Sequence, residues 1–490
     1  MSRRVIGPFN RVEGDLEVKI EITDNQVSNA WVTSPLYRGY EQILHGKAPQ
    51  DALVYVPRIC GICSVSQSVA AATALAAAQG VKPTLNGQLA TNLILATENL
   101  ADHLTHFYLF FMPDFARSVY KQRSWFKDTE QRFKAPNKDT PSGTAATELL
   151  PQRAQLMHMM GWLAGKWPHS LAIQPGGTTR AIQPQERTRM MGVLFGLRQF
   201  LQRALFGDTL ESIVELTDAS ALNSWQQQRS PLASDFSRFL HIADDLKLEQ
   251  LGRASDRFMS FGAYPTEETH LFPGGTWQNG EPSALDQSQI AEDLSHSWMQ
   301  NPTQPLHPFD GITLPDSDPN QSNGYSWCKA PRLGGEVIEV GAISRQLLAG
   351  HPLITQLVKA HGSNVKNRVI ARLIESARLV IAMEEWTKAL IPKQPFCNHG
   401  DLPKEGQAMG LIEAARGSLG HWLNFSKGRI TNYQIIAPTT WNFSPRDHSG
   451  VAGPLEQALI GAPLQDGEKD PVAVQHIVRS FDPCMVCTVH

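Results

Sequence analysis

Four of the six cysteines in this chain of 490 residues form two Cys-x-x-Cys pairs near opposite ends of the sequence. The pairs are Cys60-Gly-Ile-Cys63 and Cys484-Met-Val-Cys487, and His490 lies three residues after the second. Soft transition metals prefer thiolate ligands, so four cysteines that meet in the folded protein would hold such a metal. Nickel, iron–sulfur clusters and structural zinc all accept this donor set. Zinc knuckles usually lie within a few tens of residues of each other, whereas more than 400 residues separate these pairs.

The elements that must position these cysteines are mostly helical. The alanine-rich stretch after Cys63 predicts a helix over residues 65–79, and apolar periodicity without Gly or Pro predicts long helices over 88–112 and 364–391. Gly87 and Pro113 flank the first long helix, and Pro392 follows the second. Residues 185–206 give a weaker helical pattern, because two glycines interrupt it.

Strand patterns occur near both ends of the chain. Alternating apolar residues interrupted by a turn predict a β-hairpin over 16–32, and 411–440 contains glycines and short β-type runs such as 430–436. Residues 302–331 are rich in Pro, Gly, Asn and Asp and predict a long loop. We therefore expect an α+β fold, mainly α, with a long-helix core and small N-terminal and C-terminal β elements. A site built from both ends favours one domain over residues 1–490.

The composition excludes several classes of protein. It is 41% hydrophobic and 19% charged with a net charge of −3, which gives no electrostatic reason for binding nucleic acid or an anionic membrane. No apolar run reaches the roughly 18–20 residues of a membrane span. The apolar stretch after Arg3-Arg4 is too short for an export signal. Tight cysteine pairs indicate metal or redox chemistry rather than disulfides, so we expect a cytoplasmic protein.

The residues around both pairs, Arg58-Ile59 before Cys60 and Asp482-Pro483 before Cys484, resemble the two signature motifs of the large subunit of NiFe hydrogenases. Further matching segments follow in the order of that family: Arg11-Val12-Glu13-Gly14, Arg38-Gly39-Tyr40-Glu41, Pro175-Gly176-Gly177, Ala330-Pro331-Arg332, Glu413-Ala414-Ala415-Arg416-Gly417, Asn432-Tyr433-Gln434 and Pro438-Thr439-Thr440-Trp441-Asn442. The resemblance covers the chain from end to end and disfavours zinc.

The resemblance implies a nickel held by all four cysteines. Cys63 and Cys487 would bridge it to an iron that carries one carbon monoxide and two cyanides, while Cys60 and Cys484 would be terminal on nickel. Heterolytic cleavage of H2 needs a metal and a nearby base, and Glu13 matches the family residue that relays protons. A glutamate before a strand is otherwise a solvated carboxylate.

The resemblance also implies a set of residues around the centre. Arg416 matches an arginine over the open metal positions, and Asp102 and Asp482 match the carboxylates that hold it, as a buried arginine requires. Thr439 would donate a hydrogen bond to a cyanide, and Ala415 stands beside Arg416 where the family usually has proline.

A third metal, magnesium or a similar ion, is implied at Glu41, His490 and the backbone carbonyl of Ile435. A histidine at the end of a chain is otherwise a frayed terminus. His103 and His106 lie about one helical turn apart, and we expect core histidines rather than ligands. Cys328 and Cys397 are expected to be buried thiols, which leaves no cysteine set for an iron–sulfur cluster.

Besides Ala415, four positions depart from the common family pattern. Gln67 stands where most members have histidine, Asp15 replaces another histidine, and Ile62 and Phe110 are bulkier than the usual Val and Leu. These choices resemble the H2-sensing branch, in which larger side chains would narrow a gas path and hinder O2; plain core packing would accommodate either residue equally well. The sequence also stops at His490. Catalytic relatives are made with a C-terminal extension that is later removed, so either this extension has already been trimmed or, as in the sensors, it was never present; we favour the sensor.

The sequence therefore predicts the large subunit of an H2-sensing NiFe hydrogenase of low turnover, with H2 as substrate and Gln67 among its site residues. A small iron–sulfur subunit would accept the electrons, and a sensor histidine kinase would act downstream. The alternatives are an energy-conserving uptake hydrogenase and, outside the family, a structural zinc protein.

Overall fold

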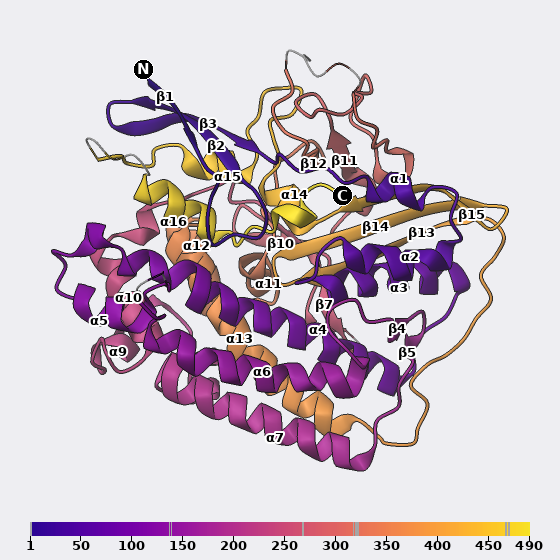
Figure 1. The fold of residues 1–490 in the computed structure, drawn as a ribbon, viewed down its shortest axis with the longest axis horizontal. Helices are drawn as coiled ribbons and strands as arrows, with labels where there is room; N and C mark the ends of the chain where they lie inside the picture. Colours follow the sequence, from indigo (N-terminus) through magenta and orange to yellow (C-terminus); the bar gives the residue numbers. More distant parts are fainter. Residues whose placement is uncertain are drawn as a thin grey trace.

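Four long helices pack together into one bundle. The computed structural model describes residues 2–136, 138, 140–266, 269–316, 318, 323–465, 468 and 471–490. Helices α4 (Leu85–Thr105) and α7 (Pro184–Phe200) each pack against both α6 (Thr144–Ala164) and α13 (Val365–Ala389), so the four form a closed set (Figure 1). Their inward faces are fully buried, as expected for amphipathic helices that share one core.

The helix predictions are confirmed in outline, with one omission. The helix predicted over 364–391 is α13, capped by the side chain of Asn364, and the pattern over 185–206 is α7 followed by a π-helical turn, Leu201–Phe206. Sequence reasoning did not predict α6, because Pro151 interrupts its apolar pattern. Proline normally breaks a helix interior, and packing against two neighbouring helices overrides that preference here.

Helix α4 begins earlier than predicted. Thr84 caps it by accepting a hydrogen bond from the backbone of Gly87, which lies in the first turn rather than before the helix. A Cβ atom at Gly87 would lie 2.5 Å from the carbonyl oxygen of Phe396, so the glycine permits a close approach of backbones. At its other end α4 passes into a π-helical segment, His106–Phe111.

Two antiparallel sheets carry the β structure near the chain ends. The predicted N-terminal hairpin is confirmed as β2 (Glu17–Thr23) and β3 (Gln26–Thr33), and β1 (Ser2–Ile6) adds a third strand. Near the C-terminal end, β13 (Gly406–Ala414), β14 (Gly417–Ser426) and β15 (Arg429–Ile436) form a second sheet. Further strands form short two- and three-stranded pairings. They are β4 (Ile173–Gln174), β5 (Gly177–Thr178), β6 (Phe258–Ser260), β7 (Ala263–Pro265), β8 (His270–Phe272), β9 (Gly275–Gln278), β10 (Glu281–Ser283), β11 (Ile290–Asp293) and β12 (Ala330–Leu333).

Helix α3 (Ser64–Gln79) lies directly on the β13–β14 hairpin. A Cβ atom at Gly410 of β13 would lie 1.9 Å from the carbonyl oxygen of Ala70, so glycine is needed on the strand at this contact. The alanine-rich face of α3 allows the same approach from the helix side. The cysteine-bearing start of α3 is thereby fixed against the turn between β13 and β14.

The predicted loop over 302–331 is largely irregular where it is described, apart from a short 3-10 turn at Pro308–Asp310. Its last two residues instead begin the strand β12 (Ala330–Leu333). Residues 317 and 319–322 of that prediction lie outside the described residues. The C-terminus lies within the molecule beside α14 (Pro438–Asn442) and α1 (Tyr40–Leu44) (Figure 1). In the described part of the chain, no helix is both long enough and apolar enough to cross a bilayer. The expected class, mainly helical with small sheets, is confirmed.

Candidate metal centre and active site

The two cysteine pairs meet in the interior. The four sulfur atoms all lie within 4.8 Å of one another and all four residues are buried. The Sγ atoms of Cys63 and Cys487, the expected bridging pair, are 2.9 Å apart, and those of Cys60 and Cys484 are 3.6 Å apart. Burial raises the pKa of the Cys487 thiol well above its usual range. Four thiols this close together cannot all lose their protons unless a cation balances the negative charge. A soft metal that binds with release of the protons supplies that charge.

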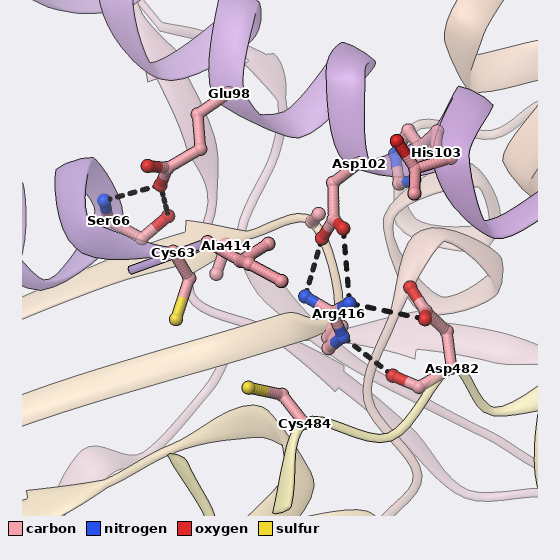
Figure 2. A network of polar contacts seen from close by, with 12 residues as sticks. Cys63, Ser66, Glu98, Asp102, His103, Ala414, Arg416, Asp482 and Cys484 are labelled. Atoms are coloured by element: carbon pink, nitrogen blue, oxygen red, sulfur yellow. Dashed lines mark hydrogen bonds and ion pairs between the residues drawn. The ribbon is translucent and has the colours of Figure 1, made fainter. Parts of the chain in front are cut away.

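The cysteines sit at the ends of structural elements rather than within them. Cys63 directly precedes α3, and Glu98 of α4 holds the first turn of that helix by accepting hydrogen bonds from the backbone of Val65 at 2.8 Å and of Ser66 at 2.9 Å (Figure 2). A carboxylate at a helix N-terminus also meets the positive end of the helix dipole. Glu98 was not predicted, because nothing in its local sequence indicates which helix end it meets.

Arg38 ties the two cysteine segments together. Its guanidinium donates to the carbonyl of Ile59, just before Cys60, at 2.7 Å, and also to the carbonyl of Val486, just before Cys487. The two segments are far apart in sequence, so one side chain that bonds both fixes their relative position. The sequence motif containing Arg38 indicated the family but not this contact.

Arg416 lies beside the cysteines and is held as expected. Asp102 of α4 accepts two hydrogen bonds from its guanidinium, at 2.5 and 3.1 Å, and Asp482 accepts through a carboxylate oxygen at 3.2 Å and its backbone carbonyl at 2.7 Å (Figure 2). Burial by itself lowers the pKa of Arg416, but the two carboxylates and the nearby thiols of Cys484 and Cys63 raise it well above its usual range. The guanidinium is therefore a fixed positive charge at the metal centre.

The backbone of Glu13 contacts the segment that carries Cys484. It forms a parallel bridge with Cys484, and the backbone N–H of Met485 donates to its carbonyl at 2.6 Å. The side chain is half-buried. Burial raises the pKa of its carboxyl, against the opposing charge of Arg416 and with the help of Cys60. A carboxyl with a raised pKa exchanges protons more readily near neutral pH.

Glu41 and His490 form a second polar cluster. Glu41 accepts a hydrogen bond from the backbone of Ile435 at 2.8 Å through one carboxylate oxygen. Its other oxygen, Oε2, and the Nε2 atom of His490 are both buried and have no partner among the described residues. Burial and the charge of Lys329 lower the pKa of His490 well below its usual range, so its imidazole is neutral. Two unpaired buried donor atoms of this kind fit a hard divalent cation.

Three residues around that cluster were not predicted. The ammonium of Lys329 lies 3.6 Å from Glu41 and 2.7 Å from Glu292, and it donates to the side-chain oxygen of Gln434 at 3.0 Å. One cation for two carboxylates leaves the cluster able to accept further positive charge. Gln434 lies within a recognised motif, but Lys329 and Glu292 carried no local signal.

Gln67 is buried on α3 and bonded to an unpredicted histidine. Its side-chain oxygen accepts from Nε2 of His421 at 2.8 Å, and Nδ1 of His421 accepts from the hydroxyl of Tyr433 at 2.8 Å. Burial lowers the pKa of His421 to about 3, so the ring is neutral with one donor and one acceptor nitrogen. The chain of contacts fixes the amide of Gln67 one helical turn after Cys63.

The remaining predicted residues lie in several different elements. Ala415 is in the turn between β13 and β14, and Thr439 accepts a hydrogen bond from the backbone of Cys484 at 3.1 Å through its hydroxyl. Ile62 is partly buried against the main core, and Phe110 is partly buried in the π-helical segment. Whether these two narrow a gas path stays a prediction.

The predictions about other histidines and cysteines need one correction. His103 and His106 are buried and bond through Nε2 to Glu375 and to the carbonyl of Arg479, which places them in the core. Cys328 is buried as expected, but Cys397 is only partly buried, because it lies in the surface connection after α13.

Four buried thiols beside an ion-paired arginine define this protein as a metalloprotein with a site for a soft metal. A model of the nickel-dependent hydrogenase family matches residues 38–131 and 118–490. The chain is similar to the Hydrogenase-2 large chain of Escherichia coli K12, at 28% identity over 100% of this chain and 97% of that protein. The periplasmic [NiFeSe] hydrogenase large subunit of Desulfomicrobium baculatum is 28% identical over 99% and 94% of the two chains.

Solved structures agree with the sequence comparison. The as-isolated oxidized Ni-Fe-Se hydrogenase of Desulfovibrio vulgaris Hildenborough superposes with a TM-score of 0.83 at 26% identity, covering 100% of both chains. The chain therefore belongs to the nickel-dependent hydrogenase family and is an oxidoreductase of H2. Its four buried cysteines fit the nickel–iron centre of that family.

Proposed function

We propose that this chain is the large subunit of an H2-sensing hydrogenase, which cleaves H2 slowly and reports its presence. The observation that carries H2 cleavage is the placement of a fixed cation, Arg416, and a proton-exchanging carboxyl, Glu13, beside one buried cluster of four thiols. Gln67 supports the sensing role, because most members of the family have histidine at this position and the glutamine resembles the H2-sensing branch.

Different residues have different roles in the proposed heterolytic cleavage of H2. A nickel–iron centre bound to the four thiolates would supply the acceptor for the electron pair of H2. Glu13 takes the proton and passes it outward, because its half-buried carboxyl has a raised pKa. Arg416 stays protonated and fixed, so it stabilises negative charge at the centre without reorganising. We further propose that the iron carries carbon monoxide and two cyanides, to one of which the hydroxyl hydrogen of Thr439 donates.

Magnesium, or a similar ion, is proposed at Glu41, the carbonyl of Ile435 and His490. A Glu41→Gln variant is expected to lose one equivalent of divalent cation and about 3–5 kcal/mol of stability, the scale for removing one partner from a buried charge cluster. Elemental analysis and thermal unfolding check both. Glu456→Gln removes another buried carboxylate, which bonds Val32 and Tyr325, and is the matched control. A Glu41→Gln protein with unchanged cation content would refute this site.

The proposal includes partners and a location. A small iron–sulfur subunit accepts the electrons, and a sensor histidine kinase receives the signal in the cytoplasm. Cys328 and Cys397, the two cysteines outside the proposed metal site, form no disulfide, which supports a reducing compartment. Residues from both ends of the chain build the site, which supports one domain over 1–490.

Turnover in air tests the sensing role. The purified complex is expected to reduce a dye with H2 at a rate about tenfold or more below an uptake hydrogenase, near the lower end of ordinary kcat values of about 1–10³ per second, and to keep that rate in oxygen. Gln67→His, which replaces the amide bonded to His421 by the ring usual in most members of the family, is expected to make the rate oxygen-sensitive.

Gln88→His is the matched control, because Gln88 is a helical glutamine that bonds Asn92 away from the cysteines. Fast turnover that oxygen abolishes in the unaltered protein would favour the second candidate, an energy-conserving uptake hydrogenase. That candidate is supported by the names of similar proteins, which include the quinone-reactive Ni/Fe-hydrogenase large chain of Wolinella succinogenes at 28% identity.

A further inference from the structure

Arg345 of α11 (Ala342–Leu348) is a fully buried arginine that reaches the turn carrying Arg416. Its guanidinium donates to the backbone carbonyl of Ala414 at 2.9 Å and to that of Ala415 at 2.8 Å. These carbonyls belong to the two residues directly before Arg416. Every one of its nitrogen atoms has an acceptor, because carboxylates complete the set.

Two carboxylates fix the guanidinium of Arg345 itself. Glu413 accepts from it at 2.7 Å, and Glu375 of α13 accepts at 2.7 and 2.9 Å through its two oxygens. Burial raises the pKa of Glu375, but Arg345 and His103 outweigh it and hold that pKa well below its usual range. The arginine is therefore a rigid, fully bonded fork rather than a mobile side chain.

The turn between β13 and β14 is short, so contacts from outside it are needed to fix its conformation. Ala414 pairs with Gly417 in the β13–β14 ladder, so Ala415 and Arg416 alone form the connection. Neither has a positive φ, whereas Gly417 has φ of 130°. Each peptide plane is rigid, so two fixed carbonyls in succession determine the direction in which the next side chain leaves the backbone. The carbonyls bonded by Arg345 set the direction of Arg416.

The same network reaches the other end of Arg416. His103 follows Asp102 on α4 and bonds Glu375 at 3.0 Å, while Asp102 holds the guanidinium of Arg416 (Figure 2). Contacts thus run in a ring from the side chain of Arg416 through α4 and Glu375 to Arg345, and back to the backbone of Arg416. The backbone and the guanidinium of Arg416 are therefore both held by one buried network.

We propose that Arg345 is a positioning residue for H2 cleavage, which holds the Ala415–Arg416 turn so that the guanidinium of Arg416 faces the metal centre. The inference rests on the proposed role of Arg416. Arg345 touches neither the cysteines nor Asp102 and acts only through the backbone of the turn and the Glu375 contact. Replacing Arg345 is therefore expected to slow H2 cleavage without changing the metal ligands.

A double-mutant cycle on the metal-loaded complex tests the proposal. Arg416→Lys is expected to slow H2 oxidation about 100-fold, the scale for one lost preorganised donor. Arg345→Lys keeps the charge but loses the fork, and is expected to slow it about tenfold with unchanged nickel content. Because both act through one side chain, the double variant is expected to be no slower than Arg416→Lys alone. A loss of about 1,000-fold, the product of the two, would overturn the proposal.

A rescue distinguishes positioning from general stability. Proline is favoured at the first central position of turns with negative φ, so Ala415→Pro is expected to restore part of the activity of Arg345→Lys and none of that of Arg416→Lys. No restoration contradicts the proposal. If Arg345→Lys does not fold, Glu413→Gln weakens the hold on the guanidinium of Arg345. This variant is expected to slow H2 oxidation about threefold, and the effect should disappear in the Arg416→Lys background.

The matched control is Arg332→Lys. Arg332 is equally buried, pairs with Asp447 and donates to the carbonyls of Pro445 and Val451, but it bonds no residue of the turn. Arg332→Lys is expected to lower thermal stability. Any effect it has on the rate of H2 oxidation is expected to multiply with that of Arg416→Lys, and not to disappear in the Arg416→Lys background. An Arg416→Lys enzyme with full activity would refute the role proposed for Arg416, whereas a loss there with a multiplicative Arg345→Lys would refute only the positioning.

Discussion

A Cys487→Ser chain is expected to be isolated without nickel or iron and without H2-dependent activity. The Sγ atom of Cys487 lies 2.9 Å from that of Cys63 and 3.2 Å from that of Cys484, at the most crowded part of the cluster. A serine oxygen is harder and far less acidic than a thiol, so it would not replace a thiolate as a ligand of a soft metal. Elemental analysis and dye reduction under H2 measure the loss, which should be complete.

Cys397→Ser is the matched control for that experiment. Cys397 is partly buried, and among the residues that the structure describes its thiol bonds the carbonyls of Pro175 and Asn398. Its replacement is expected to leave metal content and activity unchanged. Full nickel content in Cys487→Ser would show that this cysteine is not a ligand, whatever the remaining activity.

Glu13→Gln is expected to slow H2 oxidation about 1,000-fold, within the range of about 10²–10⁴ for loss of a positioned acid–base group. Glutamine has the shape of glutamate but cannot take up and release the proton. The backbone contact of Glu13 with Met485 does not depend on the side chain, so metal content should be retained. Nickel content and the exchange of hydrogen isotopes between H2 and water separate the proton step from assembly.

Asp15→Asn controls for the loss of a carboxylate in the same segment. Asp15 is exposed, two residues from Glu13, and its replacement is expected to change stability by no more than about 0.5 kcal/mol and activity hardly at all. Equal rates in Glu13→Gln and Asp15→Asn would exclude Glu13 as the proton relay.

The sequence by itself determined the helices whose pattern is local. The periodicity of α13 and the alanine-rich α3 were predicted within about two residues, because apolar spacing and capping residues act over one or two turns. It also determined the identity of the centre. The cysteine pairs and their flanks indicated the family, and the structure brings all four sulfur atoms together.

Only the tertiary structure decided what supports that centre. Glu98, Lys329 and Arg345 lie outside the quoted motifs and carry no signal of their own, since each acts on residues far away in the chain. The start of α4 and the whole of α6 were likewise decided by packing, through the close approach at Gly87 and the burial that overrides Pro151. A sequence displays the groups that do chemistry because their types are unusual, whereas the buried contacts that hold them depend on which distant segments the fold brings within hydrogen-bonding distance.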